Sequence, residues 1–283
     1  MEYRSLTMRE SGCVLYVTIS NPPINLLNFA MVDELLALAK MLDRRQHDIR
    51  VVVIDSADPD FWIAHFDVHE IGKRHDAGRP PLRGNFDRGQ QSFTSIQTLS
   101  LKWQDLPQIT IGKVNGRVRG GGVEFLLALD MRFASQGSIF GQPESDADFL
   151  ACGGGATRSF MLAGHARAME ILLSARDFTA FEYERYNLIN RALPADELDG
   201  YVQDLVDNLA LRSGDVIAMH RNVSRAVAFP LYDAILDGMS AEIKGLQMGL
   251  KNGAIEASVQ KMKRAGQSRE NELDLPATLA RLR

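Results

Sequence analysis

The chain has little of what marks several classes of protein. It has only two cysteines in 283 residues, Cys13 and Cys152, which excludes a disulfide-stapled mini-domain and favours a reducing, cytoplasmic compartment. No apolar run approaches about 18 residues, and no basic stretch precedes an apolar one at the N-terminus, so neither a membrane span nor a secretory signal is predicted. The net charge of −4 and the pI near 5.9 make nucleic acid and membrane surfaces poor candidate partners.

What is present is an ordinary globular composition whose N-terminal part alternates strand and helix patterns. Residues 13–19 are β-branched and aromatic and stop at two prolines, and residues 32–42 carry apolar side chains at helical spacing. Residues 51–55 form an uninterrupted apolar run, as in a strand covered on both faces. Strand, helix and strand predict a crossover unit. A second copy follows, with a strand at 109–114 and an apolar helix at 123–129.

The rest of the chain has short strand patterns followed by an almost purely helical pattern. Short strands fit 131–134 and 138–140, and from about Gly155 onward the pattern predicts almost only helices. Three residues interrupt those helices: Pro194, Gly214 and Pro230. Residues 75–84 combine turn formers and charge without any period, which predicts a mobile surface loop. The sequence therefore predicts an α/β front and a helical tail.

Three consecutive glycines, Gly120 to Gly122, separate a buried-type strand from an apolar helix. They would bring bare amide groups to a helix N-terminus, where a developing oxyanion is stabilised. The alternative is a tight strand-to-helix turn, whereas nucleotide binding lacks its spacing motif. Glu124 lies on the first turn among apolar residues, so its carboxylate faces a cavity or a polar partner, or serves only as a favourable acid at the helix start.

Glu144 is the second candidate acid. It follows the strand at 138–140, and Pro143 restricts Gln142 to extended geometry, so Glu144 is presented from a loop at a strand end. A solvated loop acid is the alternative. Two carboxylates that converge on one water can divide acid and base work, one holding the water and the other passing its proton. Sequence spacing leaves open whether Glu124 and Glu144 converge.

Several segments, in their order along most of the chain, resemble the crotonase, or enoyl-CoA hydratase/isomerase, superfamily. They are residues 21–25, 62–68, 114–116, 120–124, 141–144, 188–194 and 259–263. The resemblance implies an α/β fold, a crotonase-like spiral of repeated ββα/βαβ units with a C-terminal helical trimerisation region. It places the acyl-CoA site in a core of residues 1–200 and oligomer formation in residues 201–283.

The resemblance also implies roles for residues. The backbone N–H groups of Phe66 and Gly121 would hold the thioester oxygen, Glu144 would protonate the α-carbon, and Glu124 would position and deprotonate a water. The implied reaction is hydration of a 2-enoyl-CoA thioester by a homotrimer or a dimer of trimers. No metal or separate cofactor is implied, because coenzyme A is part of the substrate. Six residues are implied to bind that substrate: Ala64, His65, Asp67, Val68, Gly120 and Lys261.

The chain departs from the family pattern at several positions. His65 stands where the family normally has glycine, either tolerated at a turn or bringing an imidazole near the thioester. Phe66 replaces a usual small residue, which leaves its amide intact but narrows the pocket. Asp146 and Asp148 follow Glu144 where hydratases tend to be apolar or glycine-rich, which leaves open a different acyl group or even a different reaction. The dienoyl-CoA isomerase branch would need a carboxylate where Cys152 stands.

Three competing interpretations stay open. The first is another crotonase reaction through the same oxyanion hole, such as isomerisation, hydrolysis or decarboxylation. The second is a catalytically silent acyl-CoA-binding subunit, whose site His65 and Asp146 would spoil, although both glutamates are retained. The third concerns single residues: Lys261 is a candidate for a CoA phosphate, but a lone lysine on a terminal helix is more often a solvated charge, and the alternative for Asp67 is a helix cap alone.

Overall fold

The apolar runs of the N-terminal part form a six-stranded sheet. The computed structural model describes residues 3–76, 86–88, 91–228 and 230–282. The strands lie in the order β1 (Leu6–Ser11), β2 (Val14–Ile19), β3 (Val51–Ser56), β7 (Ile109–Val114), β9 (Met131–Ser135) and β12 (Arg191–Leu193). β1 is antiparallel to β2, and every later pair is parallel. The strands predicted at 13–19, 51–55, 109–114 and 131–134 are confirmed.

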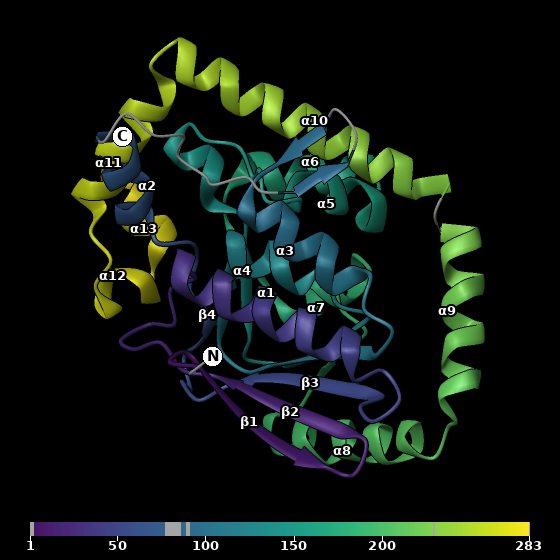
Figure 1. Ribbon diagram of the computed structural model, residues 1–283. Helices are drawn as coiled ribbons and strands as arrows, with labels where there is room; N and C mark the ends of the chain where they lie inside the picture. Colours follow the sequence, from purple (N-terminus) through teal and green to yellow (C-terminus); the bar gives the residue numbers. More distant parts are fainter. Residues whose placement is uncertain (1–2, 77–85, 89–90, 229, 283) are drawn as a thin grey trace.

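Helices cover both faces of this sheet, as Figure 1 shows for α1 (Phe29–Arg44) and α8 (Ala195–Ala210). Val52 and Ile54 of β3 belong to the core that includes the apolar face of α1, whereas Val51 and Val53 pack with α8. Alternate side chains of a strand point to opposite faces, so a strand covered on both sides needs apolar residues throughout. The predicted crossover unit, β2 to α1 to β3, is confirmed by the parallel pairing of its strands.

A second, four-stranded sheet positions the candidate site. Its order is β11 (Asp177–Thr179), β10 (Ile139–Gly141), β8 (Arg117–Arg119) and β4 (Phe61–Ile63). β4, β8 and β10 are mutually parallel, so their carboxyl ends lie at one edge. The segments that follow these ends contain Phe66, Gly121 and Glu144. Three stretches far apart in the sequence therefore meet at one place.

The helix after β8 approaches β4 closely. It is α4 (Gly121–Leu126), which ends three residues earlier than the predicted helix at 123–129. A Cβ at Gly122 would lie 2.8 Å from both the Cβ and the carbonyl oxygen of Ile63. Glycine is therefore needed here to let the first turn of α4 pack on the neighbouring strand.

The part of the chain after Gly155 is not as purely helical as predicted. β11 pairs antiparallel with β10, and β12 pairs parallel with β9. Each of these strands has three residues, too few to show a period, and tertiary pairing rather than local pattern holds them. The three predicted interruptions are confirmed, because α8 follows Pro194, α9 (Gly214–Ala228) begins at Gly214 and α10 (Pro230–Lys251) begins at Pro230.

The remaining described elements complete the chain. They are α2 (Val68–Asp76), β5 (Phe86–Arg88), β6 (Gln91–Phe93), α3 (Ser95–Gln104), the 3₁₀ helix η1 (Pro143–Ala147), α5 (Gly155–Ala163), α6 (His165–Ser174), α7 (Ala180–Arg185), α11 (Ala254–Ala265), α12 (Arg269–Leu273) and α13 (Leu275–Ala280). Of the loop predicted at 75–84, residues 77–84 lie outside the described residues, and the first two end α2. No described helix is both long and apolar enough to cross a bilayer.

The helical tail wraps around the core and returns to it. Figure 1 shows α9 and α10 on the outside and α11, α12 and α13 beside α2. The division of the chain at residue 200 stays a prediction, and its boundary falls inside α8, whose Leu198, Val202 and Val206 pack on the main sheet. Since α11 contacts α2 and η1, the C-terminal region supplies part of the wall around the candidate site.

Candidate active site

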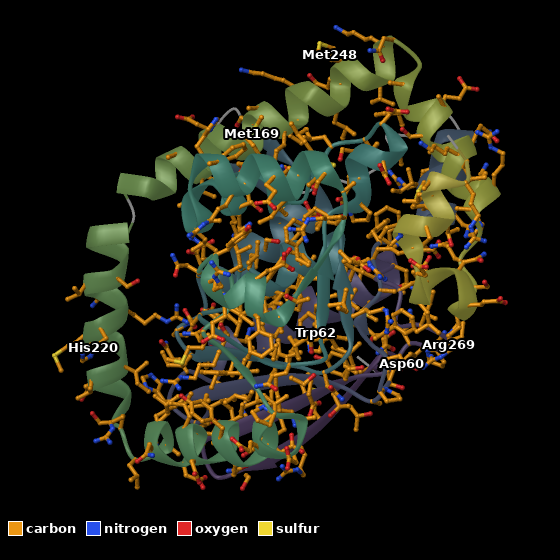
Figure 2. The ribbon with its side chains drawn as sticks, turned by 180° about the vertical axis from the view of Figure 1, so that it is seen from behind. Asp60, Trp62, Met169, His220, Met248 and Arg269 are labelled. Carbon is orange, nitrogen blue, oxygen red and sulfur yellow. The ribbon has the colours of Figure 1, made fainter. Side chains whose placement is uncertain are left out.

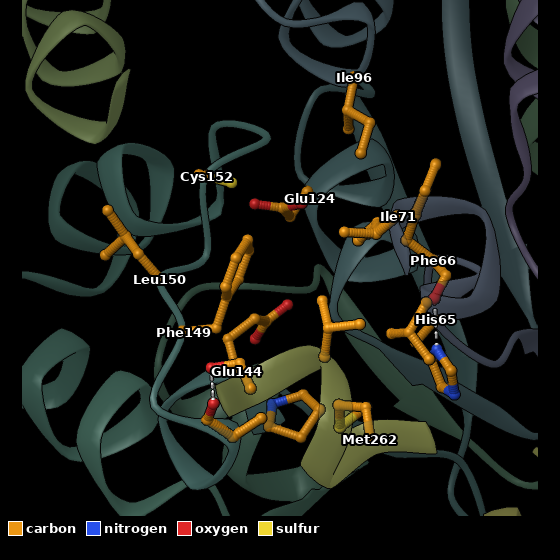
Figure 3. A pocket seen from close by; sticks show the side chains of 16 residues that line it. His65, Phe66, Ile71, Ile96, Glu124, Glu144, Phe149, Leu150, Cys152 and Met262 are labelled. Carbon is orange, nitrogen blue, oxygen red and sulfur yellow. Dashed lines mark hydrogen bonds between the residues drawn. The ribbon is translucent and has the colours of Figure 1, made fainter. Parts of the chain in front are cut away.

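A cavity lies where the carboxyl ends of β4, β8 and β10 meet the C-terminal helix α11 (Figure 3). Its wall is largely apolar, with two carboxylates and one imidazole among the lining residues. Those residues are His65, Phe66, Val68, Ile71, Ile96, Gly121, Glu124, Pro143, Glu144, Ala147, Phe149, Leu150, Cys152, Ser258, Val259 and Met262. An apolar cavity with few polar groups is the usual form of a small-molecule site.

Two backbone amides meet at this cavity. A Cβ at Gly121 would lie 3.6 Å from the Phe66 nitrogen, so the turn after β4 and the start of α4 are in contact. Within the described part of the chain neither the Phe66 nor the Gly121 amide has a hydrogen-bond acceptor, although the adjacent amides of Asp67 and Gly120 are bonded to carbonyl oxygens. Two converging, unpartnered N–H groups can hold a negatively charged oxygen.

Glu124 projects into the cavity from α4 and is 3% exposed. Its Oε1 accepts hydrogen bonds from the amides of Gly153, at 2.6 Å, and Gly155, at 3.0 Å. A Cβ on Gly153 would lie 2.3 Å from the other carboxylate oxygen, so the glycine run is a close cradle for this acid. Burial and then the nearby charge of Glu242 raise the pKa of Glu124 to about 7, although the two amides oppose the rise.

Glu144 enters the same cavity from η1, and Figure 3 shows both carboxylates directed into it. The Gln142 amide lies 3.3 and 3.1 Å from the two carboxylate oxygens, and it donates to them when the amide is turned so that its nitrogen faces the carboxylate. The protein around Glu144 removes most of its water, and this desolvation, with the charge of Glu124, raises the pKa of Glu144 to about 8. The loop acid of the sequence is thus half-buried rather than fully solvated, and it converges with Glu124 on one cavity.

His65 is buried and its ring is held at both nitrogens. Nδ1 lies 2.7 Å from the Phe66 carbonyl oxygen, and Nε2 lies 2.9 Å from Oε1 of Glu272 in α12. Burial opposes the charged ring, but the Glu272 carboxylate outweighs this and raises the pKa of His65. The imidazole therefore lines the cavity next to the Phe66 turn, and it links that turn to α12.

The other residues predicted to bind substrate lie at varying distances from this cavity. Val68 lines it, and Gly120 borders it, since a Cβ there would lie 2.7 Å from Oε1 of Glu144. Ala64 and Asp67 are not among the lining residues, and Asp67 accepts from the His69 amide at 2.9 Å, as a helix cap does. Lys261 on α11 donates to the backbone oxygen of Asp146.

The structure also shows where Asp146, Asp148 and Cys152 lie relative to the cavity. Neither Asp146 nor Asp148 is among the lining residues, and Asp148 is exposed in a left-handed conformation, with φ of 54°. Cys152 does line the cavity, where burial and the surrounding carboxylates raise the pKa of its thiol. The two aspartates therefore add no carboxylate to the cavity, whose lining carboxylates are those of Glu124 and Glu144.

Sequence reasoning missed two buried acids beside the site, Glu242 and Glu272. Glu242 of α10 accepts from the amides of Gly154, at 3.0 Å, and Thr157, at 2.9 Å, and also from the Thr157 hydroxyl and the Gln97 amide. Within the glycine run, the Gly153 and Gly155 amides thus donate to Glu124, and the Gly154 amide donates to Glu242. The sequence did contain a signal for the burial of Glu242. This residue lies three residues after Met239 and four before Leu246, which places it on the apolar face of its helix.

No group of three or more histidine, cysteine, aspartate or glutamate side chains placed to hold a metal ion occurs among residues 3–76, 86–88, 91–228 and 230–282.

Comparisons with known proteins show the family and the fold. The sequence profile of the family described as enoyl-CoA hydratase/isomerase matches residues 9–235. Among relatives, a carnitinyl-CoA dehydratase from Proteus mirabilis is 28% identical over 80% of this chain and 82% of its own length. A mitochondrial protein assigned as an enoyl-CoA hydratase, from Dictyostelium discoideum, is 26% identical over 80% and 76%. A crystal structure assigned as an enoyl-CoA hydratase, from Streptomyces avermitilis, superposes with a TM-score of 0.86 at 30% identity, over 99% of both chains.

Proposed function

Since the chain belongs to the enoyl-CoA hydratase/isomerase, or crotonase, family, we propose that it adds water across the double bond of a 2-enoyl-CoA thioester. One observation carries the proposal: two carboxylates, Glu124 and Glu144, share a cavity with two amides that have no acceptor among the described residues. The amides can hold an oxyanion, and the carboxylates can handle a water and a proton. Hydration requires all of these together.

The amides of Phe66 and Gly121 would bind the thioester oxygen. When water adds at the β-carbon, negative charge moves onto that oxygen and an enolate forms. Donors fixed in advance toward such a charge are worth roughly 10²–10³ in rate each, because they need no reorganisation during the reaction. The apolar wall, including Ile96, Phe149 and Val259, would exclude solvent and strengthen these hydrogen bonds.

The two glutamates would take opposite roles. Glu124 would hold the water, accept one of its protons and direct the hydroxyl oxygen to the β-carbon, while Glu144 would give its proton to the α-carbon. The elements of one water are thus added, and the two carboxyl groups exchange protonation states. The pKa values support this division, since the acid has the higher value, about 8, and the base the lower, about 7.

A crotonyl-CoA hydration assay tests the proposal, followed as loss of the conjugated thioester absorbance. The rate kcat/KM is expected to rise with pH as Glu124 ionises, near pH 7, and to fall as Glu144 loses its proton, near pH 8. The profile is therefore a narrow bell. Because acyl specificity is not fixed by these residues, the assay includes a panel of chain lengths and aromatic acyl groups.

Other outcomes of the same assay would contradict hydration. Migration of the double bond, or release of free CoA, would assign isomerase or hydrolase chemistry to the same amides, and release of carbon dioxide from a malonyl-type CoA thioester added to the panel would assign decarboxylase chemistry. Acyl-CoA binding without turnover on the whole panel would make the chain a silent binding subunit. The carnitinyl-CoA dehydratase relative favours testing the reverse reaction too, because hydration and dehydration pass through one transition state.

Coenzyme A would enter as part of the substrate, with no separate cofactor. We propose that it lies along the backbone of 64–68, whose Val68 side chain lines the cavity, and that Lys261 contacts a phosphate. In this structure the Lys261 amine is bonded to the Asp146 carbonyl oxygen at the wall of the cavity. Substrate binding would therefore exchange that contact for a phosphate oxygen.

We propose that the chain forms a homotrimer or a dimer of trimers. Large apolar side chains are exposed on helices of the outer shell, and Figure 2 shows Met169 and Met248 on the outer surface. Others on those helices include Leu173, Met219 and Val223. Exposed apolar groups on several helices are typical of protein–protein interfaces. Light scattering of the full chain is expected to give three or six times 31.4 kDa, and a monomeric mass would contradict this.

A further inference from the structure

The structure contains a buried ion-pair arrangement directly behind the Phe66 turn. The His65 side chain is 5% exposed and that of Glu272 is 0% exposed, and 2.9 Å separates Nε2 from Oε1. The other ring nitrogen lies 2.7 Å from the Phe66 carbonyl oxygen. The pair thus links the oxyanion turn to α12, although 207 residues separate the two in sequence.

Both neighbours of the ring are hydrogen-bond acceptors. A carbonyl oxygen can only accept, so Nδ1 of His65 carries a proton. An ionised Glu272 carboxylate also accepts, and opposite it Nε2 carries the second proton and the ring is an imidazolium. Glu272 Oε2 has no hydrogen-bond partner among the described residues, so the contact with His65 is what compensates the side-chain charge.

Glu272 is fixed in place independently of His65. Arg119 is fully buried, forms two hydrogen bonds to the Asp177 carboxylate, and donates from Nη1 to the backbone oxygen of Glu272 at 2.7 Å. At the start of the same helix, Arg269 pairs with Asp58 and Asp60, and Figure 2 shows Asp60 and Arg269 close together. These contacts use main chain or other side chains, so a change at the Glu272 carboxylate leaves the helix anchored.

We propose that His65 and Glu272 are a positioning pair that orients the Phe66 amide and directs the positive end of a buried dipole toward the bound thioester oxygen. The inference rests on the proposed function, since it assigns Phe66 an oxyanion. Neither residue needs to touch the reacting atoms. His65 holds the carbonyl that follows the donor amide, and Glu272 keeps the ring charged.

The charged groups around His65 agree with this assignment. Glu272 of α12 favours the charged ring, while burial and Arg119 of β8 oppose it, and the net effect raises the pKa of His65. Asp67, on the same turn, is bonded to the His69 amide, and Glu144 lies across Gly120 on the cavity side. An imidazolium also complements the enolate charge that addition of the water would generate.

The variant Glu272→Gln tests the charge of the His65 ring separately from the hydrogen bond that holds the ring. An amide group can donate to Nε2 of a neutral ring, so the hydrogen bond and the turn are kept while the positive charge is lost. Glu270→Gln is the matched control, because Glu270 lies on the same helix and is exposed. Nitrogen-15 NMR of the histidine rings in substrate-free protein reports the protonation state, and a His65→Gln variant assigns the signal.

In the wild-type protein both His65 nitrogens are expected to be protonated at about pH 7, where an ordinary histidine is largely neutral. In Glu272→Gln only Nδ1 should keep its proton. A neutral ring in the wild-type protein would overturn the inference whatever reaction the chain catalyses. For hydration, kcat should fall about tenfold at nearly unchanged KM, less than the roughly 10²–10³ lost with a whole donor. Glu270→Gln should match wild type.

A second measurement separates failure of this inference from failure of the proposed function. Butyryl-CoA labelled with carbon-13 at the thioester carbonyl is bound to the full chain, and its carbonyl resonance is compared with that of the free ligand. A downfield shift in the wild-type protein that shrinks in Glu272→Gln supports the pair. The same shift in both proteins overturns it. No shift in the wild-type protein contradicts the oxyanion hole itself, and the pair's positioning role with it.

Discussion

Glu144→Gln is expected to lower kcat for 2-enoyl-CoA hydration by about 10²–10⁴-fold, the usual contribution of a positioned acid, with little change in acyl-CoA affinity. The carboxyl group is the proposed proton donor to the α-carbon. Burial and the charge of Glu124 raise its pKa to about 8, so it is largely protonated below that pH. An amide has the same shape but no transferable proton. Steady-state kinetics on crotonyl-CoA and equilibrium binding of butyryl-CoA measure the two effects.

The control for this variant is Asp148→Asn, just past the end of the same 3₁₀ turn. Asp148 is exposed and left-handed, a conformation that asparagine also adopts, so its activity should equal wild type. Turnover of Glu144→Gln at the wild-type rate would remove Glu144 from the reaction.

Folding stability offers a second control on Glu144→Gln. The pKa of Glu144 is raised from its unfolded value of 4.5 to about 8, so the unfolded chain loses this proton first as pH rises. The wild-type protein therefore loses stability between these pH values, and the loss is complete above about 8. Glutamine cannot ionise, so the variant should melt at a higher temperature than wild type above that pH and show no such gain below pH 4.5.

Local pattern was sufficient for four strands of the main sheet, β2, β3, β7 and β9, and for the two acids. Strands such as 51–55 are apolar at every position because helices cover both their faces, and such runs can be recognised without tertiary information. Glu124 and Glu144 each follow a strand end and adjoin glycine or proline, which marks backbone shaped for a site. Their convergence follows from the parallel pairing of β8 and β10, which the sequence does not state.

The parts that escaped prediction depend on contacts between distant segments. β11 and β12 are three residues long and exist because β10 and β9 pair with them. Glu242 and Glu272 resemble the exposed acids of surface helices, and only their partners, the 153–157 backbone and His65, make them buried. His65 itself looked like an intrusion into a glycine position. Its ring is accommodated because α12 supplies an acceptor for it.

The charged groups that would carry the chemistry of the site are also groups whose removal from water lowers the stability of the fold. Enclosing two carboxylates and an imidazolium destabilises the fold unless each is compensated, and the chain uses backbone amides for Glu124 and an ion pair for His65. Glu144 is compensated by its own backbone amide and, once the Gln142 amide is turned toward it, by a longer contact from Gln142, and its pKa is the higher of the two. The group least stabilised as an anion is the one proposed to give up a proton to carbon.

Glu124→Gln is expected to lower hydration by a similar factor, about 10²–10⁴, but to spare a partial reaction that Glu144→Gln abolishes. The introduced amide oxygen can still accept from Gly153 and Gly155, so the cradle is kept while the base for water is lost. Exchange of the α-protons of butyryl-CoA with solvent deuterium needs only the oxyanion amides and Glu144. Mass spectrometry of the recovered thioester measures that exchange.

The exchange should also respond to pH in a defined direction. The charge of Glu124 helps to raise the pKa of Glu144, so removing it lowers that pKa, and Glu144 becomes an effective base at lower pH. The exchange profile of Glu124→Gln should therefore move toward acid relative to wild type. If exchange disappears with hydration in Glu124→Gln but survives in Glu144→Gln, the two roles are reversed. If both variants lose both reactions equally, the acids act as one unit and the division proposed for them is wrong.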